Sequence, residues 1–251
     1  MSLKEGTYCD GMYKLILNKA SQETMLAKFG DMNNSILHTA VLDCNAGVVK
    51  AILEKANSIS IPYQYSNHPY RVADFLINYS NAYDEPPLFL ACFCNKLDIV
   101  RLLLDYDAPV EFLVSIRPPN IPYEHLLHIM VFKKHYEIAA LLLSRMSGSF
   151  KNYFPSDTQQ TALHLSIVAG DRRMTELLIK YDCKVHPAQW DTVVSQAREN
   201  GHNELLDWLN DEHDEYYQLS HAIQQDGTKH VNSRKKHPLL LEIVEKRTRF
   251  I

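Results

Sequence analysis

Three histidines near the middle of the chain are the residues best spaced to bind a metal ion. His125 and His128 are three positions apart, and His135 follows within a further short stretch. Imidazoles at positions i and i+3 of a helix project from the same face, so one ion can bind both. His128, however, stands at a position where histidine recurs along the chain, as His38 and His164. This recurrence favours a structural role, and we expect no metal site and no cofactor.

Cysteine nucleophiles are the second chemistry that the residue types allow. Cys44, Cys92 and Cys183 could each meet a histidine in the folded chain, which would pair a nucleophile with a base. A chain with five cysteines and twelve histidines offers many such meetings by chance. It has neither a Gly-rich phosphate-binding loop nor a Gly-x-Ser-x-Gly nucleophile elbow. We expect no catalytic residues, and the odd number and irregular spacing of the cysteines predict reduced thiols in a cytoplasmic compartment.

The overall composition is that of an ordinary globular protein. Apolar residues make up 46% of the 251 residues, charged residues make up 22%, and the net charge is -4. Residues 228–251 hold seven Lys and Arg against two Glu, so this stretch either contacts an anionic partner or forms a solvated helix face. The chain shows no run of about 18 apolar residues and no signal-peptide pattern. We therefore expect no nucleic-acid partner, no membrane insertion and a monomer.

The elements that position these residues recur along the chain. Residues 35–40, 86–91, 125–130 and 161–166 share one frame, whose clearest copy is Thr161-Ala-Leu-His-Leu-Ser166. Each copy is followed about ten residues later by an apolar helical segment, at residues 48–53, 99–104, 138–143 and 174–179. A fifth, weaker copy runs from Thr192 to Leu209. Self-similarity of this kind indicates stacked structural repeats.

This pattern resembles the ankyrin-repeat family, whose repeat carries Thr-Pro-Leu-His-x-Ala, then Gly-His, then Val-Val-x-Leu-Leu-Leu. The resemblance implies an all-α solenoid of about five repeats with helical caps at both ends, and it covers residues 35–210. An apolar anchor should fix each inner helix in the core, and the anchors are Leu37, Leu88, Leu127, Leu163 and Val194. A small residue follows three positions later, where Met130 is an exception, and a left-handed cap then ends the helix. Gly170 and Gly201 suit that cap and Asn95 tolerates it, whereas Cys44 and Lys134 depart from the pattern.

The uneven spacing of the anchors predicts the domain organisation. The first interval exceeds the family period of about 33 residues by roughly eighteen, which places a tyrosine-rich insertion at residues 57–84. Its second half, Tyr70–Asn78, is expected to form a short helix. Residues 1–33, with helical patterns at 11–20 and 23–30, are expected to form an N-terminal cap or degenerate repeat. Residues 34–210 are expected to form the repeats, and 211–251 a helical cap or extension.

The resemblance further implies a concave protein-binding face, formed by hairpin tips and the exposed sides of the inner helices. An apolar ridge should cross this face at Leu42, Phe93, Phe132 and Val168, unless the two phenylalanines pack against each other or under the insertion. Aromatic residues exposed in this way are typical binding anchors. The residues expected to contact a partner are Asp43, Tyr83, Glu85, Phe93, Glu124, Phe132, Lys133, Gln160 and Arg198.

We therefore expect a module that binds a protein or peptide on the concave face. Two alternatives stay open: an adaptor whose residues 211–251 carry a separate docking activity, and an enzyme site in the insertion built from His68, Arg71 and Asp74. The long insertions and drifted repeats also resemble ankyrin proteins that intracellular bacteria deliver into host cells, which would place this chain among host-directed effectors.

Overall fold

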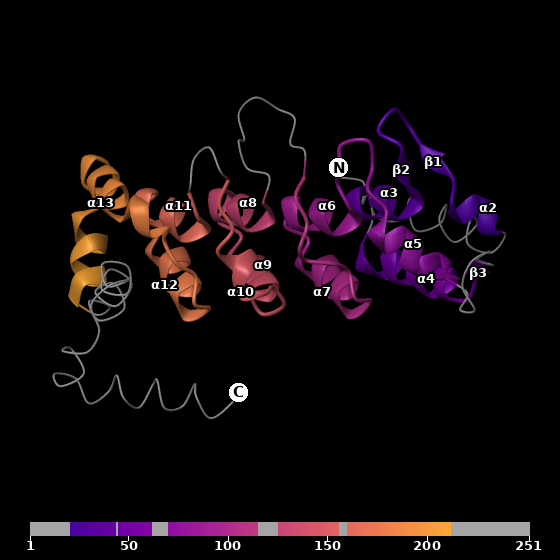
Figure 1. Ribbon diagram of the computed structural model, residues 1–251. Coiled ribbons are helices and arrows are strands. Elements are labelled where there is room, and N and C mark those ends of the chain that lie inside the picture. The colour runs from indigo at the N-terminus through magenta and orange to yellow at the C-terminus, as the bar shows by residue number, and fades with distance from the viewer. Residues whose placement is uncertain (1–20, 44, 62–69, 115–124, 156–159, 212–251) are drawn as a thin grey trace, which may run out of the picture. The chain divides into compact units, whose positions relative to one another are not determined.

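The computed structural model describes residues 21–43, 45–61, 70–114, 125–155 and 160–211. The chain divides into two compact units, Met1–His202 and Asn203–Ile251. In the first unit short helices alternate between two rows (Figure 1). In the second unit the described part is helical over residues 203–211. Among the described residues, no helix has both the length and the apolar character that crossing a membrane requires.

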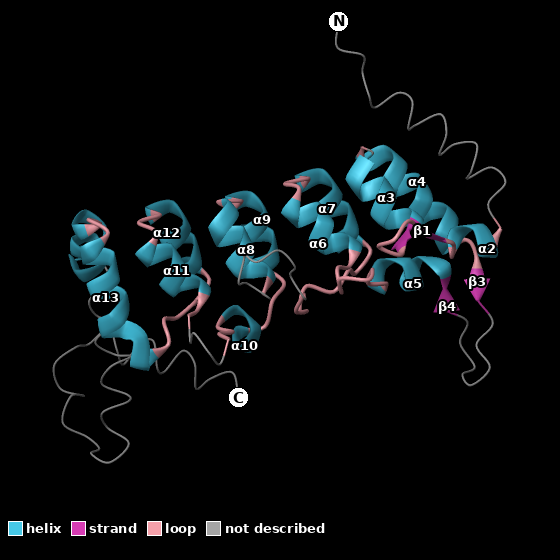
Figure 2. Ribbon diagram, turned by 90° about the horizontal axis from the view of Figure 1, so that it is seen from above, coloured by secondary structure: helices cyan, strands magenta, loops and turns pink. Residues whose placement is uncertain are grey.

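The first four repeats each contribute an inner helix to one row and an outer helix to the other, and the fifth contributes an inner helix. Figure 2 shows the successive helix pairs from a second direction. The inner helices are α3 (Ile36–Asp43), α6 (Pro87–Phe93), α8 (Leu126–Lys133), α11 (Ala162–Val168) and α13 (Trp190–Glu199). The outer helices are α4 (Ala46–Asn57), α7 (Leu97–Asp105), α9 (Tyr136–Leu143) and α12 (Arg172–Lys180). Successive inner helices pack on one another, and each outer helix packs on its own inner helix. The predicted all-α repeat fold is therefore confirmed.

Burial explains why the recurrent frame gives stacked helices. The anchors Leu37, Leu88, Leu127 and Leu163 are no more than 1% exposed, and Ala40, Ala91, Ser166 and Ala197 are fully buried at the close approach of successive repeats. Met130 is also fully buried, so the third repeat accommodates a larger side chain there. In the fifth repeat the predicted anchor Val194 is only partly buried, and Val193 before it is fully buried. Val193 and Ala197 are four residues apart and therefore share one face of α13. This helix begins at Trp190, three residues before Val193.

The turns after the inner helices have the left-handed backbone that the sequence predicted. The φ values are 56° at Asn95, 66° at Gly170 and 82° at Gly201. Lys134 adopts the same conformation, with φ 57°, although its side chain has a Cβ atom. The tight turn is therefore retained in the third repeat even though the sequence departs from glycine there.

The tyrosine-rich insertion forms a small hairpin followed by a helix. Strand β3 (Ser60–Ile61) pairs antiparallel with β4 (Tyr70–Arg71), and α5 (Val72–Asn78) follows directly. The helix predicted from Tyr70 to Asn78 is thus confirmed over most of its length. Helix α5 packs on α4 and α6, so the insertion fills the space between the first and second repeats.

The N-terminal cap differs from its prediction. A helix was expected over residues 23–30, but α2 (Gln22–Met25) is a single turn. Strand β1 (Lys28–Phe29) then pairs antiparallel with β2 (Asn34–Ser35). The reversal between them contains Gly30 at φ 65° and Asn33 at φ 52°, and inter-strand hydrogen bonds replace the helical ones. The helix predicted for residues 11–20 and the cap predicted beyond 211 lie outside the described residues.

Candidate protein-binding face

The apolar ridge consists of Leu42, Phe93, Phe132 and Val168, each of which is the last or the last but one residue of the inner helices α3, α6, α8 and α11. Phe132 is 56% exposed and Leu42 is 37% exposed. Phe93 and Val168 are half-buried. The structure therefore brings the four predicted ridge residues to equivalent places on stacked helices, with Phe132 as the most accessible of them.

Phe93 owes its partial burial to two neighbours. Its ring stacks on that of Phe89, with the centroids 5.7 Å apart. The Nζ atom of Lys133 lies 3.8 Å from the Phe93 ring centroid, a cation–π contact between the second and third repeats. Phe93 is thus held as part of the ridge, while Phe132 is left open to solvent.

Side chains from the following repeat bind the carbonyl groups at the ends of the inner helices. Lys96 Nζ donates to Leu42 O at 2.6 Å, and His135 Nδ1 donates to Cys92 O at 3.1 Å. Asn200 Nδ2 donates to Val168 O at 3.0 Å. Helix C-termini have carbonyls without intrahelical partners, so these bonds satisfy them and fix the ridge residues relative to one another.

The hairpin before the second repeat is braced by a residue that sequence reasoning missed, Asn81. Its Oδ1 accepts from the backbone N–H groups of Tyr83 and Glu85, and its Nδ2 donates to Glu85 Oε2 at 2.9 Å. His38 Nε2 donates to Glu85 O at 2.9 Å. Asn side chains commonly close turns in this way. The residue type of Asn81 and its place in a turn are the features of the sequence that could have identified its role.

The predicted contact residues divide into three groups by position. Tyr83 is 37% exposed, and Asp43 and Arg198 are exposed at the ends of α3 and α13. Glu85 and Gln160 are half-buried, and Glu85 has the structural bonds described above. Phe93, Phe132 and Lys133 are brought together in the centre of the ridge. Glu124 lies outside the described residues.

The histidines considered for metal binding are packed in the core. His125 is fully buried and His128 is 1% exposed, with ring centroids 5.1 Å apart. The His125 ring also lies 4.5 Å from Phe150 and 5.1 Å from Tyr153, which belong to and follow the short helix α10 (Gly148–Lys151). Burial is the main cause that lowers the pKa of His125 to about 3 and that of His128 to about 4.

His135 is the third histidine that was considered as a metal ligand. Its ring bonds Cys92 O and does not join the contact between His125 and His128. The part of the chain that the structure describes contains no group of three or more His, Cys, Asp or Glu side chains arranged for a metal ion. The arrangement of His125 and His128 fits the recurrent structural histidine better than a ligand pair. The other two recurrent histidines are hydrogen-bonded: His38 bonds Glu85 O, and His164 bonds Gln196 Oε1.

Of the three candidate nucleophiles, Cys92 and Cys183 are buried, and Cys44 lies outside the described residues. Burial raises the pKa of the Cys183 thiol to about 12 and also raises that of Cys92, which disfavours the reactive thiolate. In the insertion, Asp74 Oδ2 accepts from Arg71 N–H, and Arg71 Nη1 donates to Asn57 Oδ1. These two insertion residues serve the start of α5, and His68 lies outside the described residues.

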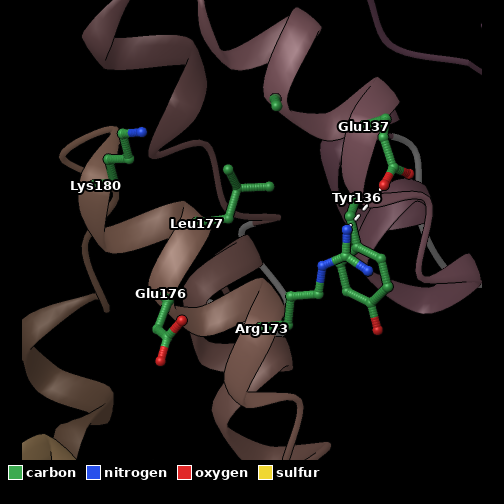
Figure 3. Close-up of a pocket in the computed structure, with 7 residues that line it drawn as sticks. Tyr136, Glu137, Arg173, Glu176, Leu177 and Lys180 are labelled. Carbon is green, nitrogen blue, oxygen red and sulfur yellow. Dashed lines mark hydrogen bonds and ion pairs between the residues drawn. The ribbon is translucent and has the colours of Figure 1, made fainter.

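A groove of about 330 Å³ lies between the outer helices α9 and α12 (Figure 3). Arg173 crosses it, with its guanidinium 4.2 Å from the Tyr136 ring centroid and 2.8 Å from Glu137 Oε1. Tyr136 in turn donates to Asp171 Oδ2 at 2.9 Å. These contacts link two repeats, and since Arg173 and Glu137 are well exposed, the ion pair adds little stability.

Comparisons with known proteins agree with this architecture. A family model described as ankyrin repeat matches residues 83–112, which contain α6 and α7. The chain is similar to the nuclear factor NF-kappa-B p105 subunit of Rattus norvegicus, at 24% identity over 70% of this chain. It spans only 16% of the length of that relative.

The chain is also similar to two solved structures. The ankyrin repeat domain of human ASB11 has a TM-score of 0.48 and 19% identity, and that of Bcl-3 has a TM-score of 0.45 and 18% identity. In each case the match covers 70% of this chain and 66% of the other chain. The recurrent helix pairs, the buried anchors and the matched repeat together show that this chain contains an array of ankyrin repeats.

Proposed function

We propose that this chain binds a protein or peptide partner on the face that carries the ridge, with Phe132 as the central anchor. Ankyrin repeats are protein–protein interaction modules, and this array presents an apolar row across four of them. The observation that carries the proposal is the 56% exposure of Phe132 beside the half-buried Phe93 and Lys133. Burying such an aromatic side chain in a complex removes apolar area from water and favours association.

The ridge also meets the geometric requirement for an interface. Its residues lie on rigid helices whose ends are held by Lys96, His135 and Asn200. A surface that is ordered before binding loses less conformational entropy when the partner docks. Tyr83 and Asp43 extend the contact surface toward the first two repeats, while Arg198 extends it toward the fifth.

Replacing Phe132 with alanine is expected to weaken partner binding by about 30-fold or more, since a central aromatic anchor typically contributes 2 kcal/mol or more. The partner is first captured from a cell extract with the wild-type chain and identified by mass spectrometry. Its affinity for wild-type and F132A chains is then measured by titration calorimetry with the purified partner.

Phe154→Ala is the matched control, because Phe154 is 36% exposed but packs edge-on against His186 outside the ridge. It should bind the partner as the wild-type chain does. If F132A binds with unchanged affinity while its unfolding transition is normal, the partner docks elsewhere and the proposal is wrong.

Delivery into a host cell and a cytoplasmic, monomeric state stay predictions from the sequence. The adaptor alternative also stays a prediction, because residues 212–251 lie outside the described residues. Deleting them tests it: an adaptor should keep the folded array and ridge binding but lose a separate activity.

A further inference from the structure

Lys134 occupies a backbone position that favours glycine. It ends α8 with φ 57° and ψ 37°. The equivalent residues of the second, fourth and fifth repeats are Asn95, Gly170 and Gly201, all with positive φ. Glycine takes this conformation without a steric penalty and asparagine tolerates it, whereas lysine has no local compensation. The third repeat therefore keeps a long cationic side chain where the local backbone would be more stable without one.

The two lysines after Phe132 are the source of charge in the middle of the ridge, whereas Asp43 follows Leu42 in the first repeat. The second repeat ends its inner helix with Phe93, Cys94 and Asn95, and the fourth with Val168, Ala169 and Gly170. The third ends with Phe132, Lys133 and Lys134. The ends of these three inner helices thus have two positive charges and no carboxylate.

Neither cation is neutralised by a described carboxylate. Lys134 is exposed, and no salt bridge of the described residues includes Lys133 or Lys134. Lys133 lies with its ammonium over the face of Phe93. A carboxylate that approached this end of α8 would come near two lysines, which follow Phe132 directly in the chain.

We infer that the partner is an acidic peptide segment, in which a carboxylate side chain lies beside the apolar group that covers Phe132. This inference rests on the proposed function and adds the chemical class of the partner. The strained left-handed backbone at Lys134 is explained if the lysine side chain makes a contact that glycine cannot make. Charge complementarity at the edge of an apolar contact chiefly sets specificity and the rate of association.

The test uses the full chain and peptides selected on it. A displayed library of random peptides of roughly twelve residues, the length of a short docking motif, is selected on the wild-type chain. One enriched peptide is synthesised with its Asp and Glu residues intact, and again with Asn and Gln in their places. Dissociation constants are measured by fluorescence anisotropy at low salt and at about 0.5 M salt, where exposed charges are screened.

We expect the carboxylate form to bind wild-type chain about tenfold more tightly than the amide form at low salt. The Lys134→Gly variant should show less than about threefold discrimination, and should unfold at a higher urea concentration than wild type because the turn is relieved. Asn95→Gly is the matched control: it makes the same backbone change one repeat away and should keep the tenfold discrimination. If K134G is more stable than wild type but loses the preference for the carboxylate form, misfolding does not explain that loss.

Two results would overturn the acidic-segment inference while leaving the proposed function intact. In the first, the binding of the peptides depends on Phe132 but is equally tight for the carboxylate and amide forms. In the second, K134G discriminates between the two forms as well as wild type does. A single-stranded RNA that binds as tightly as the peptide would also contradict it. The proposed function itself fails if no sequence enriches, or if Phe132→Ala leaves the binding of both peptide forms unchanged.

Discussion

Lowering the pH from about 8 to about 5 is expected to reduce the free energy of unfolding by about 4 kcal/mol through His125 and His128 alone. The pKa of His125 falls from 6.5 to about 3 in the folded chain, and that of His128 falls to about 4. A lowered pKa means that the native state favours the neutral imidazole. Its stabilisation is complete above pH 6.5 and is lost progressively as the pH falls toward 4 and then 3, at about 1.4 kcal/mol per pH unit for each histidine.

The packing around these rings explains why protonation is so unfavourable. His125 is enclosed by His128, Phe150 and Tyr153, and a charge on either histidine would be repelled by a charge on the other. Burial also lowers the pKa of His38 and His164, so the acid sensitivity extends along the inner helices. Urea unfolding followed by circular dichroism at several pH values measures the effect.

The control for this prediction is the double variant H125Q/H128Q. It should be less stable than wild type at pH 8, because two packed rings are lost, but its stability should change much less between pH 8 and pH 5. An identical pH dependence in wild type and the double variant would show that the acid sensitivity comes from other groups.

Replacing Gly170 with alanine is expected to destabilise the array by about 2–4 kcal/mol, the sum of left-handed backbone strain and a steric clash. The φ of Gly170 is 66°, and a Cβ atom there would overlap the imidazole ring of His202. The ring would have to move, and the turn between α11 and α12 would distort. Denaturant unfolding of the purified full chain measures the loss.

Gly148→Ala is the matched control for this substitution. Gly148 lies in α10, and a Cβ atom there would meet nothing within 4 Å. Alanine should be neutral or stabilise the protein by about 0.5–1 kcal/mol, because alanine favours helix more than glycine does. Equal effects of the two substitutions would contradict the account given for Gly170.

The repeats could be predicted because each one is encoded locally. Leu37, Leu88, Leu127 and Leu163 recur with a small residue or Met130 three positions later, and a helix buries these positions on one face whatever lies further along the chain. In the weakest copy the anchor Val194 is only partly buried. Trp190 extends α13 at its start, and sequence periodicity alone does not fix where a helix begins.

The candidate site was predictable only in part. The sequence placed Phe93, Phe132 and Lys133 at the ends of inner helices, but Lys133 and Phe89 decide that Phe93 is half-buried while Phe132 is exposed. Glu85 was expected to face a partner, and its carbonyl and carboxylate are instead bonded to His38 and Asn81. These contacts join residues of different elements, so the repeat pattern does not contain them.

The amino-acid sequence by itself thus determined the ankyrin fold, the repeat positions and the left-handed turns, because these depend on short-range periodicity and on backbone preference. Only the tertiary structure decided that Lys28–Phe29 pairs as a strand, that His125 is buried beneath Phe150, and that Lys134 keeps a glycine-like turn. The physical reason is that burial, ion pairing and strand pairing depend on which neighbours the stacked repeats bring within contact distance.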